Sequence, residues 1–360
     1  MASSPGTTIV DLRFRPLDIA MAKAFGIAGG AQELARNVLV EVTLSSGVRG
    51  YGEAAPLPPF NGETQEGALA ALEHAKARIL GQDAAAWRAL SERIRDAANS
   101  SASAACALET AVLDALVRAL GTSLRVFFGG AEEKLVTDVT ITTGTVEEAA
   151  HEARRFSAFE TLKIKVGASD VDHDEVRVRT VHHARPDARL LLDANGGFSV
   201  DEAIRLAQRL ARAGVSIALF EQPVAPGSWD ALAEVRRETG LFVAADESVT
   251  SPHDVPLAVA AKAIDAVNIK LMKSGPAQAL DIAAAARACG LRPMIGGMVE
   301  ARLAMGTSAC LAAGLGGFAF IDLDTPLFLA DDPFDGGYRY EGAVLDLSPI
   351  TLGHGCVPRA

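Results

Sequence analysis

The sequence predicts an α/β protein: a modified TIM barrel of the (β/α)7β type with an N-terminal α+β capping domain. After Leu135, short apolar segments typical of strands recur about every 25 residues, and amphipathic segments separate them. This alternation indicates parallel strands joined by helices, and seven such units with a closing strand favour a barrel. An open doubly wound sheet is the alternative, but no G-x-G-x-x-G motif follows the first of these strands.

The predicted barrel occupies residues 131–335. Its strands are expected at residues 136–142, 161–166, 189–194, 217–222, 242–247, 265–270, 292–298 and 318–324.

Residues 1–130 have a different pattern, strand-like segments followed by helix-like segments, and this pattern predicts the capping domain. Strands dominate residues 1–52, where a Ser-Ser-Gly turn separates residues 38–42 from residues 51–53. Ala-rich segments of helical periodicity follow, at residues 63–79, Trp87–Ala97 and 105–120. The tail, residues 336–360, is again β-rich, and we expect it to return to the capping domain.

Charge and composition exclude several classes of protein. The formal net charge is −11, so the chain lacks the basic surface of a general nucleic-acid binder. Charged residues interrupt every long apolar stretch, which argues against a membrane span and against a signal peptide. The four cysteines lack C-x-x-C spacing and are expected to be reduced thiols. We expect a cytoplasmic protein with no nucleic-acid or membrane partner; barrels of this kind often associate, which leaves a homo-oligomer open.

Acidic residues end three successive strands of the predicted barrel. Asp193, Glu221 and Asp246 each close an apolar segment, and the carboxyl ends of barrel strands meet at one mouth. Any one of them alone could be a helix N-cap or a solvated loop residue. Together they offer hard oxygen ligands without Cys or His, which favours Mg²⁺ over Zn²⁺.

Lysines with the alternation of inward-facing residues flank these acids. Lys163 and Lys165 share one face of their strand, and Lys270 ends a strand nearly opposite. A substrate carboxylate on the metal would hold its α-carbon between Lys165 and Lys270, as proton abstraction requires. Lys163 and the metal should lower the pKa of the Lys165 base. For a K-x-K pattern alone, a surface strand or a phosphate site is the alternative.

Five strings resemble the enolase superfamily, in its muconate-lactonising-enzyme subgroup. They are TLKIKVG (161–167), LLLDANGGF (191–198), FEQPV (220–224), ADES (245–248) and NIKLMKSG (268–275). The resemblance implies that Asp193, Glu221 and Asp246 bind Mg²⁺ and that Lys165 and Lys270 are the acid/base pair, a mechanism familiar for this superfamily. It also implies supporting roles beside them for Asn195 and Glu247.

A narrower resemblance points to the dipeptide epimerases of that subgroup. MIGGMVE (294–300), with Met298, and DLDTPL (322–327) carry it. It implies that Asp322 and Asp324 bind the α-ammonium of a dipeptide, and that the two lysines invert the C-terminal residue by 1,1-proton transfer through an enediolate. Thr140 matches a substrate-contacting position. The alternative for the two aspartates is a solvated strand end.

The expected specificity departs from that of the glutamate-specific relatives. Their mobile N-terminal loop carries an arginine where this chain has Gly30, so a buried second carboxylate would have no partner. Phe25, Ile27 and Phe60 favour an apolar or aromatic side chain instead, although Phe25 and Ile27 could equally be core residues.

Other functions on the same scaffold stay open from the sequence. They are an N-acylamino-acid racemase, an o-succinylbenzoate synthase or a cycloisomerase, and, outside enzymes, a peptide-binding barrel. The D-x-D pair favours a dipeptide as the small-molecule partner, because the substrates of those other enzymes lack a free ammonium.

Overall fold

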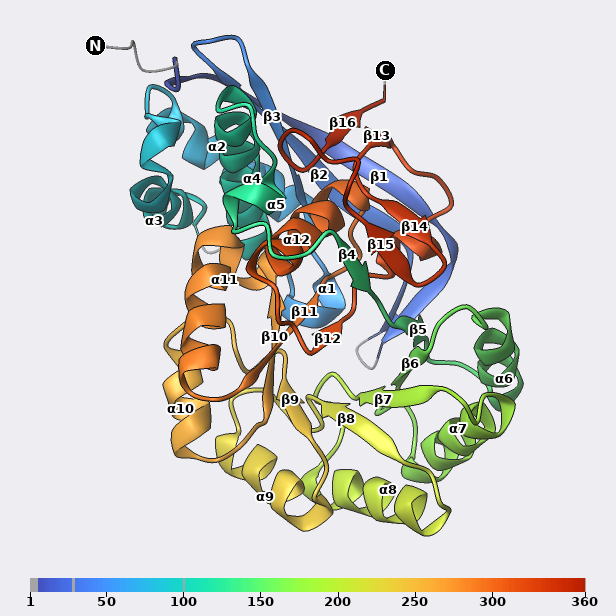
Figure 1. Cartoon of the computed structure of the whole chain (residues 1–360). Helices are drawn as coiled ribbons and strands as arrows, with labels where there is room; N and C mark the ends of the chain where they lie inside the picture. Colours follow the sequence, from blue (N-terminus) through green and yellow to red (C-terminus); the bar gives the residue numbers. More distant parts are fainter. Residues whose placement is uncertain (1–5, 28–29, 100, 360) are drawn as a thin grey trace.

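The computed structural model describes residues 6–27, 30–99 and 101–359 (Figure 1). A three-stranded antiparallel sheet begins the chain, in the order β1-β2-β3. Its strands are β1 (Ile9–Ile27), β2 (Gly30–Leu44) and β3 (Arg49–Ala54). The helices that follow are α1 (Pro58–Asn61), α2 (Gln65–Ile79), η1 (Ala84–Ala86), α3 (Trp87–Ala97), α4 (Ala102–Ala119) and α5 (Leu124–Phe127). The strands and helices together form the predicted α+β arrangement.

Helix α4 lies directly on strand β3, and two glycines make this contact possible. A Cβ on Gly52 would lie 1.9 Å from the Ala107 carbonyl oxygen, and one on Gly50 would lie 2.2 Å from the Ala115 nitrogen. Such distances are far inside van der Waals contact, so only glycine lets the two backbones approach this closely.

Eight parallel strands and the seven helices between them form the second part of the chain. In sheet order the strands are β5 (Val139–Ile141), β6 (Thr161–Lys165), β7 (Arg189–Asp193), β8 (Ile217–Glu221), β9 (Val243–Ala245), β10 (Ala266–Lys270), β11 (Arg292–Gly296) and β12 (Phe320–Ile321). The helices are α6 (Val146–Arg155), α7 (Val171–Ala184), α8 (Val200–Arg212), α9 (Trp229–Thr239), α10 (Asp254–Ala260), α11 (Leu271–Ala288) and α12 (Arg302–Leu315). This alternation confirms the predicted (β/α)7β class.

The curled sheet closes where β12 meets the start of β5. The Asp138 nitrogen donates to the Ile321 carbonyl oxygen over 2.9 Å. Side chains complete this seam, since the Thr137 hydroxyl accepts from the Leu323 nitrogen and an Asp324 carboxylate oxygen accepts from the Thr140 nitrogen. The last strand therefore brings its acidic residues directly beside the first.

The predicted strand at residues 136–142 is in fact two strands in different sheets. Strand β4 (Lys134–Val136) pairs antiparallel with β15 (Val344–Asp346), whereas β5 joins the barrel. The chain changes sheet at Thr137, whose nitrogen donates to the Ala343 carbonyl oxygen. Alternation of apolar residues continues through this point, so it gave no sign of the change.

The C-terminal tail contacts the N-terminal part of the chain. Its strands are β13 (Phe334–Gly336), β14 (Arg339–Glu341), β15 and β16 (Cys356–Pro358), and η2 (Thr325–Phe328) precedes them. The buried His354 receives a hydrogen bond on its ring from Cys356 and donates its backbone nitrogen to Asp114 of α4 over 2.9 Å. The division into two domains at about residue 130 stays a prediction.

The N-terminal part is also joined to the barrel by buried glutamates that cap barrel helices. Glu53 accepts from the Ala301 and Ala304 nitrogens at the start of α12, and Glu109 accepts from the Ala277 nitrogen in α11. Burial raises the pKa of both carboxyls to about 7, against these hydrogen bonds. These contacts fix the N-terminal part of the chain against α11 and α12 of the barrel.

Within the described residues, no helix has the length and apolar character needed to cross a membrane. All four cysteines are free thiols, as the sequence predicts, and Cys289 is the exposed one.

Candidate active site

The barrel interior has two layers, and the polar layer lies at the carboxyl ends of the strands. The lower layer is an apolar cluster of Leu191, Leu219, Ala244, Ala266, Met294 and Phe320. Two residues further along their strands stand Asp193, Glu221, Asp246, Asn268 and Asp322, which are all buried. Because side chains alternate along a strand, a step of two keeps the same face, so the polar groups rest on an apolar floor.

The three predicted metal ligands lie on neighbouring strands or directly after them. Asp193 pairs with Glu221 in the β7–β8 ladder, and Asp246 follows β9. All three are fully buried. Lysines connect them: the Lys163 Nζ lies 3.6 Å from Asp193 Oδ2 and 3.8 Å from Glu221 Oε2.

The charge balance of these acids suits a divalent cation. Burial, together with the charge of Asp193, raises the pKa of Glu221 to about 8, and its Oε2 has no hydrogen-bond partner. Burial also acts on Asp246, but Lys270 and Lys273 outweigh it and hold its pKa below the usual range. A set of buried carboxylate oxygens in which Glu221 Oε2 and Asp246 Oδ2 accept no hydrogen bond fits Mg²⁺, which takes oxygen ligands.

The two predicted acid/base lysines point into one cavity from opposite sides of the barrel. Lys165 on β6 contacts Asp193 Oδ2 at 2.5 Å, and Lys270 on β10 contacts Asp246 Oδ2 at 2.6 Å. The cavity is lined by Leu57, Phe60, Thr140, Lys163, Lys165, Asn195, Lys270, Gly297, Met298, Val299, Asp322, Asp324 and Thr325. A substrate in this cavity therefore has one lysine on each side.

Lys163 lies one layer deeper than Lys165 and serves a different set of contacts. It pairs in register with Leu191 of the apolar floor, and its Nζ reaches up to Asp322. Burial disfavours its ammonium, but Asp322, Glu221 and other nearby carboxylates outweigh burial and raise its pKa well above the usual value. We expected Lys163 to act as a cation beside Lys165. Both amines contact Asp193, but Lys163 also contacts Asp322, which follows β12.

The pKa of Lys270 is raised by the protein's own groups. Burial again disfavours the charged form, but Asp246 and Glu221 outweigh it and raise the pKa of Lys270 above its ordinary value. The effect predicted for Lys163 and the metal on Lys165 stays a prediction.

Asn195 and Glu247 lie where a supporting role was expected. The Asn195 amide accepts from Lys165 over 3.1 Å through Oδ1 and donates to Glu247 over 3.1 Å. Asn195 has a left-handed φ of 43°, a conformation that asparagine tolerates better than most residues. Burial, with the charge of Asp246, raises the pKa of Glu247 to about 7.

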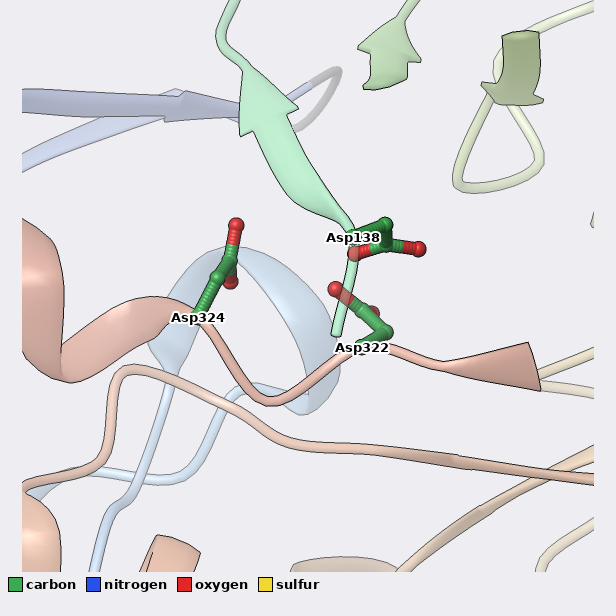
Figure 2. Close-up of side chains that lie close together, drawn as sticks. All are labelled: Asp138, Asp322 and Asp324. Carbon is green, nitrogen blue, oxygen red and sulfur yellow. The ribbon is translucent and has the colours of Figure 1, made fainter. Parts of the chain in front are cut away.

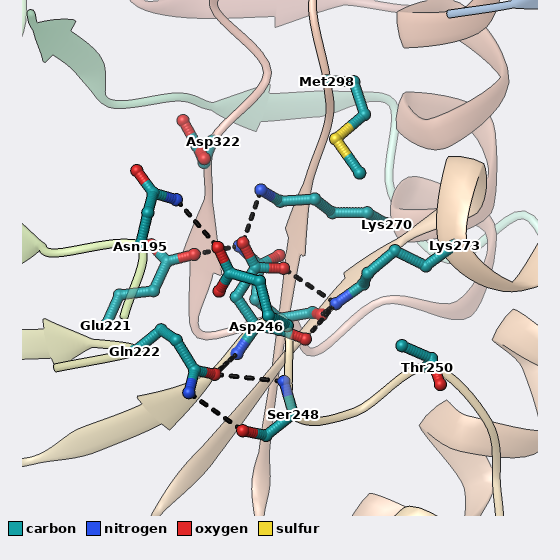
Figure 3. A network of polar contacts seen from close by, with 12 residues as sticks. Asn195, Glu221, Gln222, Asp246, Ser248, Thr250, Lys270, Lys273, Met298 and Asp322 are labelled. Atoms are coloured by element: carbon teal, nitrogen blue, oxygen red, sulfur yellow. Dashed lines mark hydrogen bonds and ion pairs between the residues drawn. The ribbon is translucent and has the colours of Figure 1, made fainter. Parts of the chain in front are cut away.

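Three further residues in this network were not assigned a role from the sequence (Figure 3). Asn268 donates to Glu221 Oε1 over 2.6 Å, and the Gln222 side-chain oxygen accepts from the Asp246 and Ser248 nitrogens. Lys273 contacts Asp246. Asn268 could have been found, since it shares the inward face with Lys270; Lys273 begins a helix, where strand alternation gives no signal.

A second acidic group lies at the seam of the barrel, formed by Asp138, Asp322 and Asp324 (Figure 2). One carboxylate oxygen from each of the three lies within 4.8 Å of the others. Asp322 and Asp324 line the cavity, and the Thr140 backbone nitrogen holds Asp324 Oδ2 at 2.5 Å. Asp138 is buried with no hydrogen-bond partner on either oxygen. The D-x-D pattern predicted a binding role for Asp322 and Asp324, whereas no sequence pattern indicated one for Asp138.

Apolar side chains also line this cavity. The Lys270 Nζ lies over the ring of Phe60 of α1, 5.2 Å from the centroid, and Met298 is another lining residue. Phe25 and Ile27 were predicted to contribute, but their side chains lie outside the described part of the structure. The backbone of their hairpin does reach the mouth, where the Gly26 carbonyl oxygen accepts from the Thr143 nitrogen.

Comparison with known families agrees with this geometry. The description "Mandelate racemase / muconate lactonizing enzyme, N-terminal domain" matches residues 10–129, and "Enolase C-terminal domain-like" matches residues 145–359. The chain belongs to the enolase superfamily. The predicted resemblance is thereby confirmed, and this superfamily member has its polar residues at the barrel mouth, where such barrels place their chemistry.

Several named relatives are similar along nearly their whole length. An aromatic dipeptide epimerase of Herpetosiphon aurantiacus is 44% identical, over 97% of this chain and 98% of its own. A hydrophobic dipeptide epimerase of Citrifermentans bemidjiense is 38% identical, over 94% and 95%. The structure of a dipeptide epimerase from Enterococcus faecalis with Mg and L-Leu-L-Tyr superposes with a TM-score of 0.92 at 30% identity, over 97% and 99%. This superfamily member is an enzyme, an isomerase of the racemase and epimerase class.

Proposed function

We propose that this isomerase is a Mg²⁺-dependent dipeptide epimerase that inverts the C-terminal residue of its substrate. The observation that carries the proposal is the position of Lys165 and Lys270, which enter one cavity from opposite strands. The same cavity holds Asp322 and Asp324, which supply negative charge for an ammonium group. A dipeptide is a small molecule that offers both an acidic α-C–H beside a carboxylate and a free ammonium.

The two lysines perform the proton transfer. One amine removes the α-proton, and the bonding electron pair moves into the adjacent carboxylate of the substrate. The ammonium of the other lysine then delivers a proton to the opposite face of the α-carbon, which inverts the centre. Asp193 and Asn195 orient Lys165, while Asp246 and the Phe60 ring orient Lys270. General acid–base catalysis of this kind contributes about 10²- to 10⁴-fold in rate.

Asp193, Glu221 and Asp246 would hold the Mg²⁺. When bound there, the ion polarises the substrate carboxylate and makes the α-C–H more acidic. The unpartnered Glu221 Oε2 and the oxygen-only donor set support this assignment. Asn268 keeps Glu221 in place through its other oxygen.

Asp322 and Asp324 would bind the α-ammonium of the dipeptide. Both lie on the far side of Lys163 from the metal ligands, so the substrate can place its carboxylate and its ammonium at opposite ends of the cavity. An N-acylamino acid, by contrast, has no ammonium group to pair with these carboxylates, which argues against the racemase alternative.

The wall of the cavity favours an apolar or aromatic side chain. Leu57, Phe60 and Met298 line it, and no arginine is among the described residues that do so. A glutamate side chain would be buried there without a cationic partner of its own. The names of the relatives from Herpetosiphon and Citrifermentans support the same preference. A cytoplasmic location and a homo-oligomeric state stay predictions.

Exchange of the α-proton in ²H₂O tests the function directly. The protein is incubated with Mg²⁺ and a panel of L,L-dipeptides, and mass spectrometry follows deuterium at the C-terminal α-carbon. We expect exchange and epimerisation with apolar and aromatic C-terminal residues, none with the N-acetylated dipeptides, and loss of activity with EDTA. Absence of exchange with every dipeptide would refute the proposal, and exchange with N-acylamino acids alone would favour the racemase.

A further inference from the structure

Lys273 is a buried lysine that the proton transfer does not use. It stands in the first turn of α11, three residues after Lys270, and its side chain is 3% exposed. Its Nζ contacts Asp246 Oδ1 at 2.8 Å, the Asn268 carbonyl oxygen at 2.9 Å, and the Asp246 carbonyl oxygen (Figure 3). Three donors of an ammonium thus meet three acceptors, which satisfies the group fully inside the protein.

The backbone of α11 allows this position. Gly275 has φ 71° and ψ 163°, which breaks the helix between its first turn and the part that begins at Pro276. A Cβ on Gly275 would lie 2.3 Å from Glu109 Oε2, so a side chain there would displace the Glu109 carboxylate as well as strain the backbone. The separate first turn carries Lys273 across the ends of β9 and β10.

Two lysines therefore hold the two oxygens of one carboxylate in different ways. Lys273 contacts Oδ1 and is itself fixed by two backbone carbonyl oxygens. Lys270 forms an ion pair with Oδ2 at 2.6 Å, and its amine lies over the Phe60 ring. Oδ1 is committed to a fixed contact, whereas Oδ2 is held by Lys270 alone, whose amine a divalent cation at that oxygen would displace.

We propose that Lys273 is a positioning residue that fixes Asp246 so that it presents Oδ2 alone to a divalent cation. This inference rests on the metal site of the proposed function. A carboxylate free to rotate would lose the orientation that a metal site needs, and removal of such supporting contacts typically weakens metal binding about 10- to 100-fold. Lys273 also joins the loop after β9 to the end of β10, which keeps a ligand strand and a lysine strand in register.

Positioning and simple charge repulsion predict opposite changes in metal affinity when Lys273 is removed, so one measurement distinguishes them. Lys273→Met removes a positive charge beside the site, so electrostatics alone predicts tighter binding of a cation. Loss of positioning predicts weaker binding. Mn²⁺ affinity, measured by electron paramagnetic resonance of the free ion without any dipeptide, separates the two.

We expect the Mn²⁺ dissociation constant of Lys273→Met to rise at least about tenfold. Lys270→Met is the matched control, since its amine contacts the available oxygen of the same carboxylate; its Mn²⁺ affinity should be unchanged or tighter. Unchanged or tighter binding by Lys273→Met overturns the inference, as does an equal loss in both variants.

A second variant covers the case in which Lys273→Met does not fold. Lys273→Gln is shorter and has two N–H donors in place of three, so it cannot meet all three acceptors, and thermal unfolding checks that it is intact; a wild-type Mn²⁺ dissociation constant in it also overturns the inference. Lys134→Met, at an exposed lysine, should leave both the melting temperature and the affinity unchanged. Absence of Mn²⁺ binding by the wild-type protein would instead refute the proposed metal site itself, whether or not dipeptides exchange.

Discussion

The acids on the two sides of Lys163 are alike in residue type and burial but differ in their partners. Asp193 and Asp246 each contact lysines, at 2.5–3.6 Å. At the seam, Asp138, Asp322 and Asp324 lie within 4.8 Å of one another and share Lys163 as their cation. The first group, Asp193, Glu221 and Asp246 with their lysines, is nearly neutralised by the protein. The second group, Asp138, Asp322 and Asp324, keeps a surplus of negative charge.

The pKa values follow this difference. Burial raises those of Asp193 and Asp246, but the lysines prevail and both lie below the usual range; Glu221, with a more distant lysine, is the exception. Burial and the neighbouring Asp322 raise the pKa of Asp324 to about 6 and that of Asp138 well above its ordinary value. Under the proposed function, a cation brought by the substrate would relieve the second group, while the first would exchange lysine contacts for those of a metal.

The largest effect is expected from the lysines of the first group. Lys270→Ala should slow epimerisation by about 10³-fold, because one face of the α-carbon loses its proton donor or acceptor. Exchange by Lys165 with substrate of one configuration should persist, and NMR in ²H₂O measures both rates. Unaltered epimerisation would show that Lys270 is not part of the acid/base pair.

Asp322→Asn tests the second group with a smaller effect. We expect the KM for a dipeptide to rise about 100-fold, since a buried charge pair with the ammonium is lost. The Mn²⁺ dissociation constant should stay within about threefold of the wild type, because Asp322 lies outside the proposed set of metal ligands. Asp335→Asn, at an exposed aspartate, serves as the control for steady-state kinetics. Parallel losses of metal and dipeptide binding would contradict the separation of the two groups.

The raised pKa of Asp324 predicts a pH dependence. As the pH falls through about 6, this carboxylate gains a proton and its attraction for the ammonium weakens, so kcat/KM for a dipeptide should fall relative to that of Asp324→Asn. The free energy of unfolding changes with pH in the opposite direction. The pKa of Asp324 in the folded protein exceeds the unfolded value of about 3.9, so the folded state binds more protons. This contribution to stability is lost as pH rises from about 4 through about 6.

Measurements at pH 5 to 8 check both signs. The ratio of wild-type to variant kcat/KM isolates Asp324 from the lysines, which both proteins share. Urea unfolding of the two proteins over pH 4 to 7 gives the second comparison. A ratio independent of pH would mean that Asp324 keeps one protonation state throughout.

The smallest effect is expected at the apolar lining of the cavity. Phe60→Ala should raise the KM for dipeptides with an aromatic C-terminal residue about tenfold and leave that of L-Ala-L-Ala within about twofold. Phe318→Ala, at a cavity on the amino-terminal side of the barrel, is the matched control. Equal effects on both substrates would show that Phe60 acts through its contact with Lys270 rather than by contacting the substrate side chain.

Alternation along single strands was sufficient to predict most of the first group. Lys163 and Lys165, Asn268 and Lys270, and the acids that end β7 and β8 all lie on the face that period two assigns to the barrel interior. Alternation could not reveal the change of sheet at Thr137, which aims Asp138 at β12 although the two are far apart in the sequence. Nor could it reveal Lys273, whose partner lies on a different element.

The sequence by itself determined the fold class, the faces of the strands and the identity of the groups at the mouth, because backbone periodicity is local. The tertiary structure decided which charges meet. Lys163 lies between two acidic groups, and Lys270 and Lys273 hold opposite oxygens of Asp246, because barrel closure and the broken helix α11 bring distant residues together. Electrostatic energies depend on those distances and on burial, neither of which is a property of the local sequence.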